Sequence, residues 1–240
     1  MPINDNLILI AGKSATGKSL SLRNLTPPEG VMYLNCETGK KLPFNSKFQE
    51  ATVVDPYQVY EAFNHAETLP DCHTIVVDSL TFLMDMYESV HVLTASNTMK
   101  AWGDYAQFFK VLMSQYVAKS TKNVIFTAHT LDVLNEQEMA METLVKVKGS
   151  LMNNGIEAFF STVIAAKKLP TQKLEPYKSS MLNITDEEEM LGFKYCFQTK
   201  LTKETVNERI RSPFAMWATE ETYVDNDIQQ VLNKLHTYYK

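Results

Sequence analysis

The chain has little of what marks a secreted, membrane-bound or metal-stapled protein. Its three cysteines, Cys36, Cys72 and Cys196, lie far apart and show no paired spacing. That pattern argues against a disulfide frame or a zinc site and favours reduced thiols. No apolar run approaches the roughly 18 residues of a membrane span, and the N-terminus lacks the basic-then-apolar order of a signal peptide. We therefore expect a cytoplasmic protein without a membrane partner.

The chain also has fewer basic than acidic side chains. The 240 residues include 23 Lys and Arg against 28 Asp and Glu, which gives a net charge of −5. A surface that is basic overall is excluded, so any contact with nucleic acid must come from a local patch. We find no internal repeat or low-complexity tract, and the length predicts a single domain over 1–240. Its core is expected at about 5–168, with a hairpin and C-terminal extension over about 169–240.

One stretch near the N-terminus fits a phosphate-binding loop at every fixed position. Residues 12–19 read GKSATGKS, which matches G-x-x-x-x-G-K-[ST], between an apolar run at 7–11 and a helix-compatible segment at 20–25. The glycines let backbone N–H groups turn toward phosphate oxygens at the start of a helix. Lys18 would reach the β- and γ-phosphates, and Ser19 would ligate Mg²⁺. A glycine-containing turn without a ligand is the alternative. The predicted loop residues are Gly12, Lys13, Ser14, Ala15, Thr16, Gly17, Lys18, Ser19 and Leu20.

Later apolar segments predict strands that end in polar side chains. The run at 74–77 reads as a strand buried on both faces, and Asp78 follows it directly. The carboxyl edge of a parallel sheet collects ligands, so Asp78 is predicted to hold Mg²⁺. Residues 122–129 predict another buried strand, ending in His129, which could contact the γ-phosphate. The alternative for His129 is a simple hydrogen bond at a strand end, since no zinc partners are spaced nearby. Further strands are expected at 31–36 and 51–55, and helices at 57–69 and within 79–119.

The rest of the chain, from residue 132 onward, is predicted to contain a loop, a hairpin and a helix. We expect a long loop over 132–154, whose basic and amide side chains could contact a phosphate backbone or simply be solvated. Strands at 160–167 and 190–199 predict a hairpin around a charged tip, and 226–239 predicts an amphipathic helix with Asp227 as its cap. Arg209 or Arg211 could reach a neighbouring subunit's nucleotide as an arginine finger, with ordinary surface charge as the alternative. The candidate DNA-contacting residues are Lys146, Lys148, Asn153 and Asn154.

With these motifs in order, the chain resembles the RecA-fold ATPases, and more closely the small phage-encoded RecA/RadA-like proteins of single-strand annealing and recombination. The resemblance implies an α/β fold, in which a mostly parallel sheet is flanked by helices and followed by a C-terminal hairpin and a terminal helix. It also implies that Glu37, after the strand at 31–36, activates the attacking water; a solvated acid at the end of a strand is the alternative. The segments that carry the resemblance are GKSATGKS, NCE, IVVDS, WGDY, VIFTAH and RSP.

The same resemblance implies a hydrolase with ATP and Mg²⁺ as cofactors. Expected partners are single-stranded DNA, further copies of the chain in a ring or filament, and a single-stranded DNA-binding protein, in the host cytoplasm if the protein is phage-encoded. Three other hypotheses for the function stay open. They are a helicase-type DNA motor, a small-molecule or nucleotide kinase, and a regulatory ATP-binding module that contacts protein.

Overall fold

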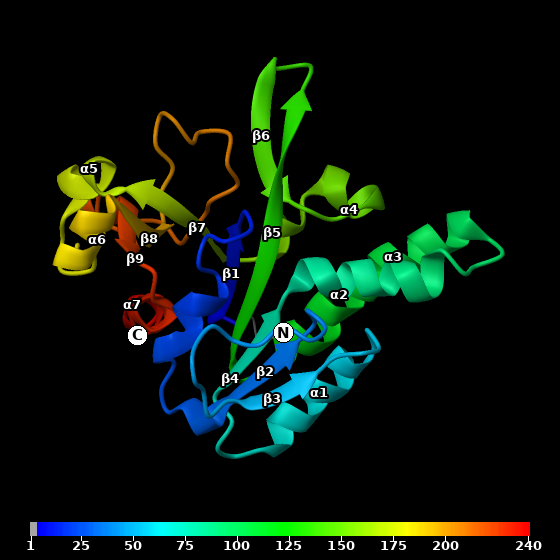
Figure 1. Cartoon of the computed structure of the whole chain (residues 1–240). Helices are drawn as coiled ribbons and strands as arrows, with labels where there is room; N and C mark the ends of the chain where they lie inside the picture. The colour runs from blue at the N-terminus through cyan, green and yellow to red at the C-terminus, as the bar shows by residue number, and fades with distance from the viewer. Residues whose placement is uncertain (1–3) are drawn as a thin grey trace.

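The computed structural model describes residues 4–240 and has one mixed β-sheet at its centre (Figure 1). Within these residues the sheet has nine strands in the order β3-β2-β4-β5-β1-β7-β8-β9, and β6 pairs with β5 off this path. Neighbours from β3 to β7 are parallel, whereas β8 and β9 run antiparallel. The strands are β1 (Leu7–Gly12), β2 (Val31–Asn35), β3 (Gln49–Thr52), β4 (Thr74–Asp78), β5 (Asn123–Asn135), β6 (Ala140–Val145), β7 (Thr162–Pro170), β8 (Phe193–Gln198) and β9 (Tyr223–Asp225).

Helices cover both faces of this sheet. The α-helices are α1 (Gln58–Thr68), α2 (Leu80–Tyr87), α3 (Thr98–Val111), α4 (Gly149–Asn154), α5 (Thr171–Leu174), α6 (Asp186–Leu191) and α7 (Ile228–Tyr238). The π-helical turns are η3 (Glu88–Val92) and η4 (Leu112–Tyr116), and the 3₁₀ turns are η1 (Ser19–Asn24), η2 (Pro28–Gly30), η5 (Val117–Lys119), η6 (Ile156–Phe159), η7 (Glu175–Tyr177) and η8 (Glu220–Thr222). The predicted α/β class is confirmed. No helix between residues 4 and 240 is both long and apolar enough to cross a membrane.

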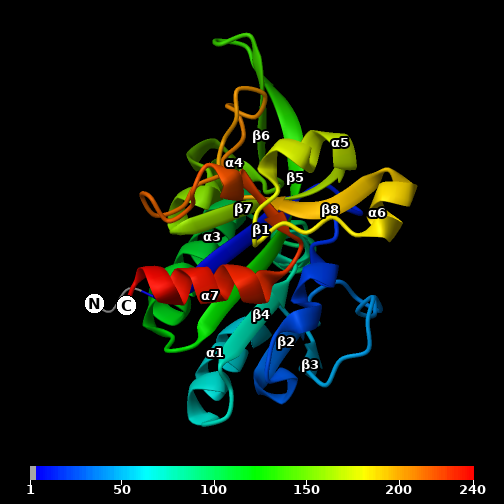
Figure 2. The same ribbon diagram turned by 90° about the vertical axis from the view of Figure 1, so that its left-hand side faces the viewer.

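Alternate side chains of β1 face two different layers, one on each side of the sheet. Leu7, Leu9 and Ala11 pack into the core that contains α1, α2 and α3. Ile8 and Ile10 point to the opposite layer, which contains η1 and α7. This period of two is what a strand buried on both faces requires. Figure 2 shows α7 lying across the face of the sheet opposite α3.

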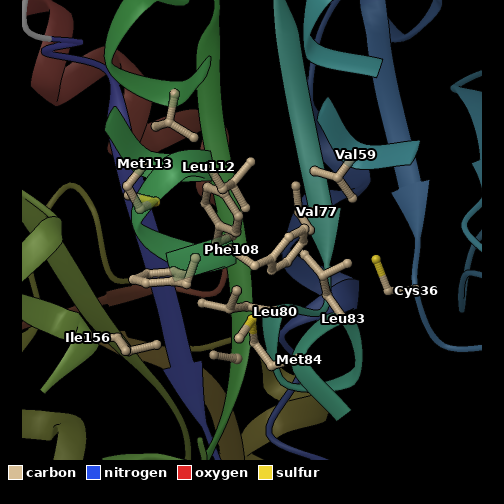
Figure 3. Packing of buried hydrophobic residues seen from close by; sticks show 14 of the residues in the cluster. Cys36, Val59, Val77, Leu80, Leu83, Met84, Phe108, Leu112, Met113 and Ile156 are labelled. Atoms are coloured by element: carbon tan, nitrogen blue, oxygen red, sulfur yellow. The ribbon is translucent and has the colours of Figure 1, made fainter. Parts of the chain in front are cut away.

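The layer of α1–α3 is a continuous apolar core. Figure 3 shows part of this core, to which the helices α1, α2 and α3, the turns η4 and η6, and the sheet all contribute. The labelled side chains are Cys36, Val59, Val77, Leu80, Leu83, Met84, Phe108, Leu112, Met113 and Ile156. Each is buried. Burial of each large side chain stabilises the fold by roughly 1.5–3 kcal/mol, so this layer fixes the strands whose ends carry the polar groups.

The prediction of a long loop over 132–154 is wrong. β5 continues past His129 to Asn135, and β6 returns antiparallel, with the register running from Thr130↔Val145 to Asn135↔Ala140. The Asn135 side chain accepts hydrogen bonds from the backbone of Gln137 (3.1 Å) and Glu138 (3.2 Å), which closes the turn. We call residues 130–145 the β5–β6 hairpin, and α4 follows it. Figure 1 shows the hairpin projecting beyond the rest of the sheet.

The helix expected after the phosphate loop is only the six-residue 3₁₀ helix η1. The Ser21 hydroxyl donates to the carbonyl of Lys18 at 2.6 Å, a local bond that competes with α-helical pairing. Pro27 and Pro28 then prevent any extension of the helix. The loop therefore leads into a short, tight turn against α7.

Several strand boundaries also differ from expectation. The strand expected at 51–55 is β3, which ends at Thr52, four residues before Pro56. The strand expected at 190–199 begins only at Phe193, because 186–191 form α6. A capping box between Thr185 and Glu188 starts that helix, and Gly192 ends it with φ 74°. The pairing of β7 with β8 confirms the hairpin, and the Asp227 side chain caps α7 as predicted.

Candidate functional site

The phosphate loop connects β1 to η1 at the carboxyl edge of the sheet. A Cβ on Gly12 would lie 2.6 Å from the carbonyl oxygen of Ala166, so only glycine fits there. Gly17 has φ +85°, which again favours glycine. The Lys18 side chain is buried within this turn, where its ammonium donates to the carbonyls of Gly12 (3.0 Å) and Lys13 (2.8 Å). Burial lowers the pKa of Lys18 to about 8.

The other predicted loop residues surround this turn. Thr16 closes it by donating from Oγ1 to the carbonyl of Lys13 at 2.9 Å. Ser14 and Ala15 are exposed, and Ala15 has φ 59°. Ser19 and Leu20 are partly buried at the start of η1. The loop is therefore open to solvent on its outer side and anchored through Lys18 on its inner side.

Asp78 is held rigidly at the end of β4. Its side chain is buried and accepts hydrogen bonds from the hydroxyls of Tyr33 (2.8 Å, to Oδ2) and Thr127 (to Oδ1). Burial, together with the charge of Asp78, raises the pKa of Tyr33 well above its ordinary value. Tyr33 therefore stays a neutral donor. The neighbouring Ser79 hydroxyl is buried and has no hydrogen-bond partner within residues 4–240.

Glu37 lies beside this group because Asn35 is opposite Asp78 in the β2–β4 register. Its carboxylate contacts the imidazole of His129 at 3.4 Å and forms an ion pair with Lys40. The hydrogen bond from His129, followed by the interactions with Lys40, lowers the pKa of Glu37 to about 2 against the opposing effect of burial. His129 is itself placed by the β1–β5 register, in which it is opposite Gly12. The structure thus brings together Lys18, Asp78, Glu37 and His129.

These side chains fit a magnesium–triphosphate ligand. Lys18 donates to loop carbonyls where phosphate oxygens would serve better, because a charged acceptor makes a stronger hydrogen bond than a neutral one. Mg²⁺ usually takes one or two protein oxygens together with waters and substrate phosphates. Ser19 and Asp78 are the residues that would hold the ion.

The predicted DNA-contacting residues lie together at the base of the β5–β6 hairpin and on α4. Lys146, Lys148, Asn153 and Asn154 are all exposed. Lys148 is engaged by Glu88 at 2.6 Å, and Lys146 continues the chain from β6. The far end of the hairpin is acidic, with Glu136 and Glu138 in its turn. Between the two ends of the hairpin, a polyanion would therefore meet favourable charge at the end near α4.

The two candidate finger arginines occupy different settings. Arg209 lies inside its own subunit, where its guanidinium contacts Glu157 (3.2 Å) and Glu142 (3.4 Å). Arg211 is exposed, and its backbone pairs with that of Val163. A role in a neighbouring subunit stays a prediction for both, and Arg209 would first have to leave its carboxylates.

Four further residues of the site were not predicted from the sequence. Tyr33 and Thr127 orient Asp78, Lys40 pairs with Glu37, and Asp132 of β5 binds the Lys13 ammonium at 2.7 Å. Tyr33 and Thr127 are polar residues inside otherwise apolar strands, which is the one signal that could have marked them. Asp132 was hidden because its strand was mistaken for a loop.

This fold and site define a P-loop ATPase domain. A family model described as an AAA domain matches residues 4–192, and the chain belongs to this AAA domain family. No curated protein matches the chain. Among solved structures, the chain is similar to the flagellar accessory protein FlaH from Methanocaldococcus jannaschii, with 14% identity, a TM-score of 0.38, and coverage of 82% of this chain and 78% of FlaH.

Proposed function

We propose that the protein hydrolyses Mg·ATP and uses the nucleotide cycle to control its hold on single-stranded DNA, in phage-type recombination or strand annealing. The observation that carries this proposal is the continuity of β5. The same strand carries His129 beside the phosphate loop and then forms the β5–β6 hairpin that leads to α4. A change at the nucleotide would therefore reach the predicted DNA-contacting surface through one strand.

Each side chain of the site has a role in this proposal. Lys18 would exchange its two loop carbonyls for the β- and γ-phosphates. Mg²⁺, held by Ser19 and Asp78, would neutralise phosphate charge. Glu37 is ionised at neutral pH and would orient the attacking water by accepting its hydrogen bond. His129 already contacts Glu37, so it would connect loss of the γ-phosphate to β5.

DNA contact is assigned to Lys146, Lys148, Asn153 and Asn154. Two lysines and two amides at the exposed end of the site suit phosphate contacts without sequence preference. An assembly of copies in a ring or filament, and a single-stranded DNA-binding protein as partner, belong to the same proposal. In such an assembly Arg211, which is exposed, could reach a neighbour's nucleotide without breaking an ion pair.

The test is steady-state ATP hydrolysis with and without single-stranded DNA, at low and high salt. We expect stimulation by DNA that is weakened by salt and abolished in Lys18→Ala. The double variant Lys146→Ala/Lys148→Ala should lose the stimulation but keep basal turnover. A matched control, Lys178→Ala/Lys203→Ala, changes two exposed lysines outside the hairpin and should behave like the wild type.

A kinase is the second candidate, because a cavity of about 480 Å³ adjoins the phosphate loop at Lys13 and Thr16. Such a space, lined also by Lys167 and Arg209, could admit a phosphate acceptor. Hydrolysis that DNA does not change, together with phosphate transfer to a small acceptor, would favour this candidate over the first. DNA-stimulated turnover with directional strand unwinding would instead indicate a motor.

A further inference from the structure

The groups suited to the terminal phosphate all lie on one side of β1. In the order of the sheet, β2, β4 and β5 lie on the side that carries Glu37, Asp78 and His129, whereas β7, β8 and β9 lie on the other. A nucleotide whose γ-phosphate faces Asp78 and Glu37 must extend its nucleoside away from them. The side chains that β7–β9 present to the phosphate loop therefore decide where the nucleoside lies.

Two side chains from that side reach the loop at Gly17. A Cβ placed on Gly17 would lie 3.3 Å from Cδ1 of Tyr195 and 3.2 Å from Oδ1 of Asn226. Tyr195 belongs to β8, and Asn226 lies in the turn between β9 and α7. Tyr195 and Asn226, which lie far from Gly17 in the sequence, thus form a wall directly against the phosphate loop.

Asn226 is unusual because its side chain is buried without a partner. The residue is 3% exposed, and neither its amide nitrogen nor its amide oxygen has a hydrogen-bond partner within residues 4–240. Its backbone carbonyl accepts a hydrogen bond from Arg23 at 2.7 Å, which fixes the residue in place. Buried polar groups in folded proteins are nearly always paired, so an unpaired carboxamide beside a ligand loop points to a ligand. It offers one donor group and one acceptor.

Tyr195 belongs to a partly exposed aromatic surface. Its ring lies 5.8 Å from that of Phe193 in an edge-to-face arrangement. The ammonium of Lys168 lies 3.7 Å from the centre of the Phe193 ring and 5.8 Å from that of Tyr195. Aromatic faces of this kind stack with nucleobases, because every base has a π-face.

We propose that the base of the bound nucleotide stacks on Tyr195 and that the Asn226 carboxamide hydrogen-bonds to its nucleoside. The side chain of asparagine, with a donor beside an acceptor, matches the N6/N7 edge of adenine and not the N7/O6 edge of guanine. The ligand class is therefore an adenine nucleotide. This inference rests on the proposed function, since it concerns the same site.

Stacking is tested with 2-aminopurine riboside triphosphate, whose emission falls when the base stacks on an aromatic ring. Each variant is measured at saturating protein. We expect quenching in the wild type and in Tyr195→Phe, and at least a twofold recovery of emission in Tyr195→Ala. The control is Tyr239→Ala, the same change at a partly exposed tyrosine beyond the opposite end of α7 from Asn226. Equal quenching in Tyr195→Ala and the wild type would overturn the assignment of Tyr195.

Asn226 is tested with Asn226→Leu, which is similar in size and lacks polar groups. If the carboxamide only fills space, this variant keeps its ATP affinity and is at least as stable, because an unpaired buried amide is lost. If the carboxamide binds the nucleoside, thermal stability is likewise unchanged or higher, but ATP binding is about tenfold weaker. Competition by inorganic triphosphate, which has no nucleoside, is unchanged. We expect this second outcome. Equal affinity for ATP in Asn226→Leu and the wild type would refute the role of Asn226.

Failure of the nucleoside site can be told apart from failure of the proposed function. If wild-type protein binds ATP in a Lys18-dependent manner but Tyr195 and Asn226 variants behave like the wild type, this inference alone is wrong. If ATP binding by the wild type does not depend on Lys18, the proposed function is wrong, and with it the nucleoside site. Preference of the wild type for GTP over ATP would likewise contradict the adenine assignment.

Discussion

Glu37 carries the chemical step in the proposed mechanism, and its surroundings make it a permanent anion. His129 and Lys40 both hold the carboxylate, and its pKa of about 2 keeps it ionised throughout the neutral range. In Glu37→Gln we expect ATP hydrolysis to fall by about 10²–10⁴, the usual contribution of a positioned acid or base. ATP affinity should change by less than about threefold, because Glu37 would contact water and not the nucleotide.

Single-turnover hydrolysis and equilibrium binding separate these two quantities. The control is Glu29→Gln, an exposed carboxylate paired only with Lys47 at 3.2 Å. That variant should hydrolyse ATP at the wild-type rate. A Glu37→Gln protein that turns over normally would assign water activation to another group.

The buried ammonium of Lys18 leads to a prediction about proton uptake when ATP binds. Its pKa of about 8 in the free protein lies below the ordinary 10.5 because the ammonium is buried. A bound triphosphate brings negative charge to the ammonium and raises this pKa, so ATP binding between about pH 8 and 10 should take up a fraction of a proton. Calorimetric titration at pH 8.5 in buffers of different ionisation enthalpy measures the uptake.

The matched variant for this measurement is Lys18→Arg. A guanidinium remains protonated at all these pH values, so binding by this variant should show no uptake. Uptake of the same size in Lys18→Arg would mean that another group, and not Lys18, changes its protonation.

At the level of elements, the base of the β5–β6 hairpin depends on Arg209. This side chain joins Glu142 of β6 to Glu157 of η6, and the Glu157 side chain is 5% exposed. Replacing Arg209 by Met leaves a buried carboxylate without its cation, which should cost about 2–3 kcal/mol, less than a fully buried pair because Arg209 itself is partly exposed. Chemical denaturation measures the loss, and amide exchange should locate it at β6.

Two further variants make this prediction specific. Adding Glu157→Gln to Arg209→Met should recover part of the stability, because the unpaired charge is removed. Arg211→Met, two residues away on an exposed side chain, should change stability by less than about 0.5 kcal/mol. Equal losses in the two arginine variants would show that the ion pairs are not what holds the hairpin.

At the scale of the whole molecule, the C-terminal helix completes the layer that supports the phosphate loop. Leu235 of α7 is fully buried in the core that includes Ile8 and Ile10 of β1. Leu235→Ala should lower the free energy of unfolding by about 2–5 kcal/mol, through lost burial and the cavity left behind. Phe214→Ala, at a side chain that is 92% exposed, is the control and should have little effect.

The sequence predicted those parts of the fold in which local pattern and tertiary environment agree. The apolar runs before Gly12, Asp78 and His129 are strands buried on both faces, so a short continuous run was enough to place them. The outer half of β5 is not buried in this way. Its alternating residues were read as loop because nothing in the sequence showed that β6 would pair with them.

The sequence predicted the site residues that lie in a motif or at the end of a strand, and it did not predict the others. Lys18, Asp78, Glu37 and His129 follow directly from a motif or a strand terminus, and the parallel sheet brings them together. Contacts that cross the sheet, such as those of Tyr33 and Thr127 with Asp78, depend on register, which the sequence does not state. Asn226, far from the loop in sequence, belongs to this second group.

One further feature is the backbone hydrogen bond of 3.1 Å from Thr143 of β6 to the carbonyl of Asn207. In mechanical terms, it makes the β5–β6 hairpin a cantilever clamped at its root by the chain around 205–211. The rungs from Val133↔Glu142 to Asn135↔Ala140 project beyond this clamp. Because a cantilever carries its greatest bending moment at the clamp, a load at the turn would be borne at the root of the hairpin, next to His129 and the phosphate loop.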